Sequence, residues 1–258
     1  MKRSSFALAC CFAALATGMG ASPLAEEEAL SEPPWDLFEP CASATYPDQA
    51  DSLYVLPYPV GVTHNVRQGN CNPFNSHNQR FKEDFAYDFE MPIGSTIVAA
   101  RDGEVWRTRD HFRDDQNRLE QGNFVVILHD DGSYAMYGHL TEGGALVETG
   151  EAVVAGQPIA RSGNSGLSKG PHLHFSVKVC PEGETLGSRE CQSVPVTFRN
   201  TRPHPKGLIG SPASKIGGGQ RYEALPLEEA PPEAAAPPGE DRSPAEDASP
   251  EAGTSSAA

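Results

Sequence analysis

The sequence predicts an all-β fold, in which an antiparallel sheet turns back on itself or packs against a second small sheet. Two observations support this prediction. Between residues 41 and 210, short runs of β-branched and aromatic residues alternate with glycine-centred turns. No 15-residue segment shows a helical spacing of apolar residues. With 258 residues, the chain is long enough for one large or two small domains and can bury a sizeable core.

Each expected strand is a short apolar or β-branched run that ends near a turn. In chain order the strands are Ala86–Phe89, Thr96–Ala99, Glu104–Thr108, Phe124–His129, Tyr134–His139, Val153–Val154, Pro158–Ala160, His172–Val179 and Val194–Phe198. Turns are expected at Asp102-Gly103 and Gly143-Gly144, and Asp130-Asp131-Gly132 is the clearest hairpin signal. The polar insertion from Arg109 to Gln121 is expected to be a loop or one short helical turn.

The N-terminus has the pattern of a secretory signal peptide, expected over residues 1–21. Met1-Lys2-Arg3 is basic, and Phe6 to Ala16 is an apolar run of 11 residues, too short to span a bilayer. We therefore expect cleavage near residues 20–25 and a periplasmic or secreted protein with no stable membrane insertion. A lipoprotein signal at Leu8-Ala9-Cys10-Cys11 is the alternative, and it is disfavoured because it would cut the apolar run short.

Charge and cysteines define the rest of the organisation. The net charge of −15 argues against sequence-nonspecific nucleic-acid binding, but residues 22–40 carry −6 and residues 222–258 carry −8. We expect residues 22–40 to be an acidic linker and residues 211–258 to be a disordered Pro/Ala/Glu-rich tail. Export would leave four cysteines in an oxidising compartment, and the favoured pairing is Cys180–Cys191 with Cys41–Cys71.

Histidines supply the candidate chemistry. His172 and His174 lie two apart on an expected strand, so both imidazoles project from one face, with Leu173 and Phe175 on the other. Such a pair favours a shared metal, proton or substrate, although surface pairs also occur by chance. The small residues of Gly163-Asn164-Ser165-Gly166 predict open space beside the two rings.

Two more side chains belong with this pair. Asp88 is a carboxylate inside an aromatic strand, where a buried charge needs a partner that a cation would provide. His139 ends another expected strand, and strict alternation places it on the same face as Ala135 and Tyr137.

These motifs together resemble the lysostaphin-type (LytM-like) zinc metallopeptidases, which cleave peptide cross-links of bacterial peptidoglycan. The resemblance runs from about Gln68 to Val179. It rests on Asn75-Ser76-His77, the run from Phe85 to Ser95, the run from Val98 to Val105, Tyr137-Gly138-His139-Leu140, and Gly163-Asn164-Ser165-Gly166 with His172-Leu173-His174-Phe175. Several motifs in this order make the resemblance specific.

The resemblance implies a lysostaphin-like domain over residues 41–210, with an antiparallel sheet and a second small sheet of the barrel–sandwich hybrid type. It implies that His77, Asp88 and His174 bind one Zn²⁺ and that His139 and His172 are catalytic. Two imidazoles and one carboxylate leave a coordination position open, as in catalytic zinc sites. In the most compact family motif the first histidine would stand at Asp84, so here it must come from a longer loop, with His64 as the rival to His77.

The expected function is therefore that of an exported zinc metalloendopeptidase that hydrolyses peptide bonds of peptidoglycan stems or cross-links. We expect a monomer whose partners are peptidoglycan peptides and not nucleic acid. A catalytically inactive domain of the same fold that activates a cell-wall amidase is the first alternative. A glycan-binding module or a biotin-like carrier domain is the second.

Overall fold

The computed structural model describes residues 44–70, 76–77, 81–188, 190–203, 207–208, 210 and 219–227. Within these ranges the chain forms β-strands and one turn of 3-10 helix, Leu119–Gln121, in the predicted polar insertion. No helix in the described ranges is long and apolar enough to cross a membrane. The predicted signal peptide (1–21) and acidic linker (22–40) lie outside the described residues. The all-β prediction is confirmed.

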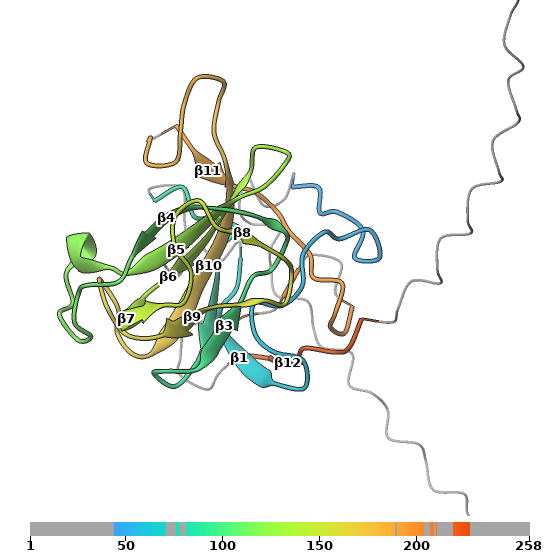
Figure 1. Cartoon of the computed structure of the whole chain (residues 1–258). Coiled ribbons are helices and arrows are strands. Elements are labelled where there is room, and N and C mark those ends of the chain that lie inside the picture. The colour runs from blue at the N-terminus through green and yellow to red at the C-terminus, as the bar shows by residue number, and fades with distance from the viewer. Residues whose placement is uncertain are drawn as a thin grey trace, which may run out of the picture. The chain divides into compact units, whose positions relative to one another are not determined.

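The larger sheet contains nine of the described strands and runs β12-β1-β2-β10-β6-β5-β4-β8, with β11 paired to β10 (Figure 1). Its strands are β1 (Thr63–Gln68), β2 (Tyr87–Glu90), β4 (Gly103–Arg109), β5 (Phe124–Leu128), β6 (Tyr134–Gly138), β8 (Ala152–Val153), β10 (His172–Val179), β11 (Gln192–Ser193) and β12 (Arg221–Glu223). The described neighbours all pair antiparallel. Strands β2, β10 and β6 lie at the centre and position the candidate site.

A second small sheet was also predicted and is present. It runs β3-β9-β7 and consists of β3 (Thr96–Val98), β9 (Pro158–Ser162) and β7 (Leu140–Ala145). Apolar side chains of both sheets share one core, in which Ile97 and Ile159 of the small sheet join Tyr137 and Phe175 of the large one. The Ala100 N–H donates to the Tyr137 hydroxyl at 2.7 Å, which ties the two layers together.

Alternation along the central strands separates core from site. Leu173 and Phe175 on β10 are fully buried in the core, as are Tyr87 and Phe89 on β2. The residues between them project from the opposite face, because successive strand residues point to opposite sides. This arrangement confirms the predicted shared face of His172 and His174.

The predicted hairpin at Asp130-Asp131-Gly132 joins β5 to β6. Arg101 stabilises the turn, because its guanidinium donates to Asp131 Oδ2 at 2.6 Å and also to Asp130. Burial raises the pKa of Asp131, but hydrogen bonds from Ser133 and Arg101 outweigh it and lower the pKa to about 2. The ionised carboxylate therefore stabilises the turn.

The predicted Cys180–Cys191 bridge is present. It closes the loop between β10 and β11, two strands that pair antiparallel through Lys178 and Ser193. Cys41 and Cys71, the other predicted pair, lie outside the described residues.

One strand prediction and one turn prediction were wrong. Val194–Phe198 forms no strand, because its backbone bonds to the segment before β1. The Thr197 carbonyl accepts from the Ser52 hydroxyl, while Phe198 packs in the core. Gly143-Gly144, expected as a turn, lies inside β7, where Gly143 has a φ of 65° and the pairing register shifts. Glycine inside a strand commonly marks such an irregularity.

The predicted disordered tail, 211–258, was wrong at residues 219–227, which fold onto the domain. Here β12 pairs with β1, so that His64 lies opposite Tyr222. Tyr222 is 1% exposed, and its carbonyl accepts a hydrogen bond from Tyr58 at 2.8 Å. The acidic composition around this segment indicated disorder, but the buried ring of Tyr222 packs the segment against the domain. The residues from 228 onward lie outside the described ranges.

The Tyr222→Ala substitution is expected to lower the free energy of unfolding by about 3–5 kcal/mol, because it removes a fully buried aromatic ring and leaves a cavity. Chemical denaturation followed by circular dichroism measures this change. The control is Leu225→Ala, which truncates a side chain that is 41% exposed and should stay within about 0.5 kcal/mol of the parent. Equal effects of the two substitutions would contradict the docking of β12.

The Asp131→Asn substitution should lower the unfolding free energy by about 1 kcal/mol at pH 7, a value reduced for solvent screening because the side chain is 49% exposed. The folded-state pKa lies below the unfolded value of about 3.9. The stabilisation is therefore complete above roughly pH 4 and is lost as the pH falls towards about 2. Denaturation curves of both proteins across this range should converge at the acidic end, and a constant difference would rule out the ionic contribution.

Candidate functional site

The candidate site begins on the central strands of the large sheet. Asp88 on β2 lies opposite His174 on β10, and His174 lies opposite Gly138 at the end of β6. Asp88 is 1% exposed, so its carboxylate is removed from water. A buried charge of this kind requires partners within the site.

The structure brings His77, Asp88 and His174 together. His77 Nε2 and His174 Nδ1 each lie 3.1 Å from Asp88 Oδ1. One ligand atom of each residue lies within 4.8 Å of the other two. His77 Nδ1 faces the Gly69 carbonyl at 3.3 Å, so an N–H there puts the lone pair on Nε2, where it can bind a cation. The rival, His64, packs edge-on against Tyr58 and is not part of this group.

The chemistry of the three donors suits a zinc ion. Two imidazole nitrogens and one carboxylate oxygen are the ligand types that Zn²⁺ takes at catalytic sites with three protein ligands. His77 is 3% exposed and Asp88 1%, so both are already withdrawn from solvent. The residues present therefore fit the metal that the resemblance implies.

The second oxygen of Asp88 is held by β1. Gln68 donates to Oδ2 from its side-chain amide, and Arg67 lies 3.9 Å from the same oxygen. The pairing of β1 with β2 has an irregularity at this point, because Val66 is opposite Phe89 whereas Gln68 is opposite Asp88. Arg67 is thus the extra residue of a β-bulge, which lets two successive side chains reach the same carboxylate.

His174 has a second carboxylate on its far side. Its Nε2 lies 3.7 Å from Glu83 Oε2, and Lys178 Nζ lies 2.5 Å from the other oxygen of Glu83. Burial alone would lower the pKa of His174, but Asp88 and Glu83 outweigh it and raise the pKa to about 10. The two carboxylates therefore favour the protonated form of His174.

The sequence reasoning missed Glu83 and Lys178. One signal was available, since Lys178 lies four residues after His174 on the same strand and so on the same face. Glu83 precedes β2 in a turn, and its position could not be read from spacing.

His139 and His172 lie beside the three candidate ligands, with 4.5 Å between their ring centroids. His139 Nδ1 is 2.7 Å from the Ser165 carbonyl, and His172 Nδ1 is 2.8 Å from the Gly170 carbonyl. In both rings Nδ1 is therefore assigned the N–H, which leaves the lone pair on Nε2. Burial lowers the pKa of His139 to about 4 and that of His172 to about 3, so both rings are neutral at pH 7.

His139 reaches the site in a way that alternation did not predict. Ala135 and Tyr137 face the core, and strict alternation placed His139 with them. The strand ends at Gly138, and His139 has a φ of 60°, in the left-handed region. This backbone turn redirects the ring to the face of Met136, which lines the same groove. A non-glycine residue in this region is uncommon and carries strain.

The loop of residues 163–166 is packed, which corrects the prediction of open space beside the histidines. Asn164 and Ser165 are buried. A Cβ on Gly163 would lie 2.2 Å from the backbone nitrogen of Thr141, so glycine is required for close packing against β7. The loop therefore acts as the support that presents the Ser165 carbonyl to His139.

A groove of about 330 Å³ opens over His77, His139 and His174. Its walls are mostly apolar and come from loops on both sides. They include Phe81, Leu119, Phe124, Met136 and Leu167. Phe81, Leu119 and Leu167 are strongly exposed, which is typical of a surface that contacts a ligand.

Comparison with known proteins gives a family match that covers part of this site. Residues 83–187 match the model of peptidase family M23. This range includes four of the five predicted site residues, and His77 lies before it.

Two relatives come from Vibrio cholerae. The peptidoglycan DD-endopeptidase ShyA is 36% identical over 124 residues, which are 47% of this chain and 26% of ShyA. The peptidoglycan DD-endopeptidase ShyB is 35% identical over 124 residues, which are 47% of this chain and 27% of ShyB. The chain thus matches only about a quarter of the length of these relatives.

The solved structure of the antimicrobial peptidase lysostaphin from Staphylococcus simulans is 24% identical. The alignment covers 56% of this chain and 52% of lysostaphin, with a TM-score of 0.37, so the assignment rests on the sequence matches. Residues 83–187 therefore match peptidase family M23, which supports the predicted resemblance to the lysostaphin-type peptidases.

Proposed function

We propose that this protein is an exported zinc metalloendopeptidase that hydrolyses peptide bonds in peptidoglycan. The observation that supports this most strongly is the group of His77, Asp88 and His174, whose donor atoms converge within 4.8 Å. The M23 match and the names of the two Vibrio relatives support the reaction and the substrate class. The Cys180–Cys191 disulfide is in keeping with an oxidising compartment such as the periplasm or the cell exterior.

In this proposal His77 Nε2, His174 Nδ1 and Asp88 hold one Zn²⁺. The chemistry that zinc supplies when bound at such a site is Lewis acidity, which polarises an amide carbonyl and makes water nucleophilic near neutral pH. Glu83, whose carboxylate lies 3.7 Å from His174 Nε2, would orient this ring electrostatically, as carboxylates commonly do for metal-bound histidines. The positive charge of Lys178 balances the negative charge of Glu83, so this carboxylate stays ionised although it is mostly buried.

His139 and His172 handle protons in this proposal. Both are neutral at pH 7 and have the accepting lone pair on Nε2, so either can take a proton from the attacking water. The same nitrogen, once protonated, can donate to the amine that leaves when the C–N bond breaks. A protonated ring can also donate a hydrogen bond to the developing oxyanion. The apolar groove excludes water around the peptide and strengthens these contacts.

The His172→Ala substitution is expected to lower the rate of peptide release from purified sacculi by roughly 10²–10⁴-fold, because it removes a general acid–base group. Zinc content should be unchanged, since His172 is not among the three proposed ligands. Mass spectrometry of the released muropeptides measures the rate and identifies the bond, and a chelator-treated digest tests metal dependence. A zinc-loaded parent that releases nothing would contradict the proposed function and favour an inactive domain.

The Glu83→Gln substitution should weaken Zn²⁺ binding by roughly 10–100-fold, because it removes the carboxylate that orients His174. Competition with a fluorescent chelator gives the affinity without any assay of activity. In the parent, binding must displace a proton from His174, whose pKa is raised to about 10, so affinity should increase as the pH rises from 6 to 8. Glu184→Gln, which changes an exposed carboxylate outside the site, is the matched control. A parent affinity independent of pH would contradict the role of His174.

A further inference from the structure

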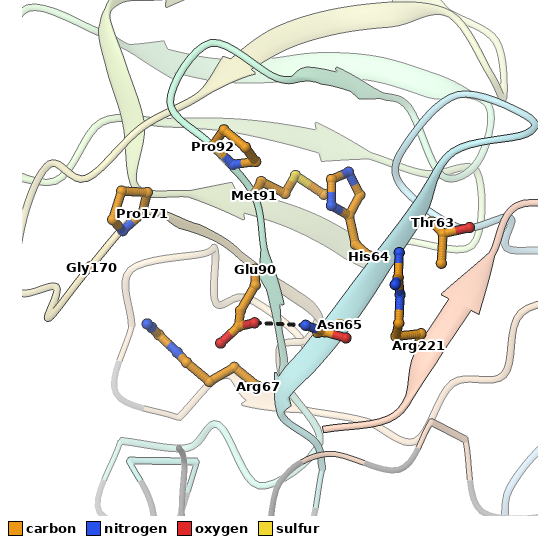
Figure 2. Close-up of a pocket in the computed structure, with 10 residues that line it drawn as sticks. All are labelled: Thr63, His64, Asn65, Arg67, Glu90, Met91, Pro92, Gly170, Pro171 and Arg221. Carbon is orange, nitrogen blue, oxygen red and sulfur yellow. Dashed lines mark hydrogen bonds between the residues drawn. The ribbon is translucent and has the colours of Figure 1, made fainter. Parts of the chain in front are cut away.

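A second cavity, of about 350 Å³, lies beside the strands that carry the site (Figure 2). It is formed by β1, β2 and β12 and by Gly170-Pro171, the loop that leads directly into His172. Glu90 in its wall is the β2 residue opposite His172. The cavity therefore lies next to His172, and among the described residues it shares no lining residue with the groove.

Arg67 connects this cavity to the site. The β-bulge in β1 directs Arg67 towards Asp88, 3.9 Å from Oδ2, and its side chain also lines the cavity (Figure 2). The residue is only 6% exposed. Among the described residues this long contact is its one ion pair, and no hydrogen bond to its guanidinium is present there. A buried guanidinium has five N–H donors, and this one has a single long contact within the described part of the chain, so it can bind an anionic ligand.

The other charged groups of the cavity set its preference. Arg221, exposed on β12, adds a second cation. Glu90 supplies the one carboxylate among the described lining residues, and Asn65 donates to it at 3.0 Å (Figure 2). Burial lowers the pKa of His64, the remaining titratable group, so it adds no charge at neutral pH. Two arginines against one glutamate favour a single negative charge and disfavour a dianion such as phosphate.

We propose that this cavity, which we call the Arg67 pocket, binds a carboxylate of the peptide substrate close to the scissile bond. The inference rests on the proposed function and deepens it. A peptide that crosses the row of histidines would place its apolar part in the groove and its carboxylate on Arg67. Peptidoglycan stems carry free carboxylates on residues that supply the amide nitrogen of a cross-link. Arg67 suits such a group, because a guanidinium binds a carboxylate through two parallel hydrogen bonds.

Two synthetic peptide dimers test the proposal with the full chain. In one, the residue that supplies the scissile amide nitrogen carries a free carboxylate, and in its twin that group is a carboxamide. Cleavage of the pair gives a ratio of kcat/KM, and calorimetry with the corresponding product peptides gives binding without turnover. Both readouts should favour the carboxylate by roughly 10- to 100-fold, as expected for a charge-assisted hydrogen bond.

Variants assign the preference to the pocket. Arg67→Gln should abolish it at unchanged zinc content, Arg67→Lys should restore part of it, and Arg221→Gln should reduce it to a smaller extent. Arg161→Gln removes an exposed arginine of β9, outside both cavities, and should leave the ratio as in the parent.

Equal binding of both product peptides by the parent would overturn the proposal. So would an equal loss for both peptides in Arg67→Gln, because Arg67 would then only position Asp88. A preference in binding without any cleavage of sacculi would support the pocket and overturn the proposed function instead.

Discussion

The site depends on one constraint, the buried carboxylate of Asp88. At 1% exposure this group has lost almost all of its hydration, so the fold must surround it with donors and cations. Its two oxygens have separate partners. Oδ1 faces the rings of His77, His172 and His174, whereas Oδ2 faces Gln68 and Arg67. His77 and His174 each have a ring nitrogen 3.1 Å from Oδ1. A metal bound by these two histidines would add positive charge next to the buried carboxylate.

The regular pairing of the strands brings these groups close together. Local irregularities of the backbone then orient the individual side chains towards the site. Register across β2, β10 and β6 sets Asp88 beside His174. The β-bulge in β1 then turns both Arg67 and Gln68 to the carboxylate, and the left-handed backbone of His139 turns its ring out of the core direction. Bulges and strained residues concentrate at functional sites because they redirect a side chain without changing the sheet.

Much of this arrangement could be predicted from the sequence, because it follows from a period of two. The shared face of His172 and His174, the hairpin at Asp131, and the all-β class with a second small sheet all depend on local pattern. The grouping of His77 with Asp88 came from the family resemblance. The local sequence pattern did not predict the features that depend on contacts between residues far apart in the chain. Glu83 is near His174 only through the tertiary fold. Strand β12 pairs with β1 and buries Tyr222, although the composition of the surrounding stretch indicates disorder.

The central claim is that two imidazoles and one carboxylate hold zinc while two other imidazoles remain unligated. X-ray absorption at the zinc edge of the full-length protein tests it directly. The expected first shell contains two histidine nitrogens and otherwise oxygen. The same shell should persist when His139 and His172 are both replaced by alanine. Loss of an imidazole from the shell of that double variant, or a parent protein that binds no zinc, would contradict the assignment of His77 and His174 as the two imidazole ligands.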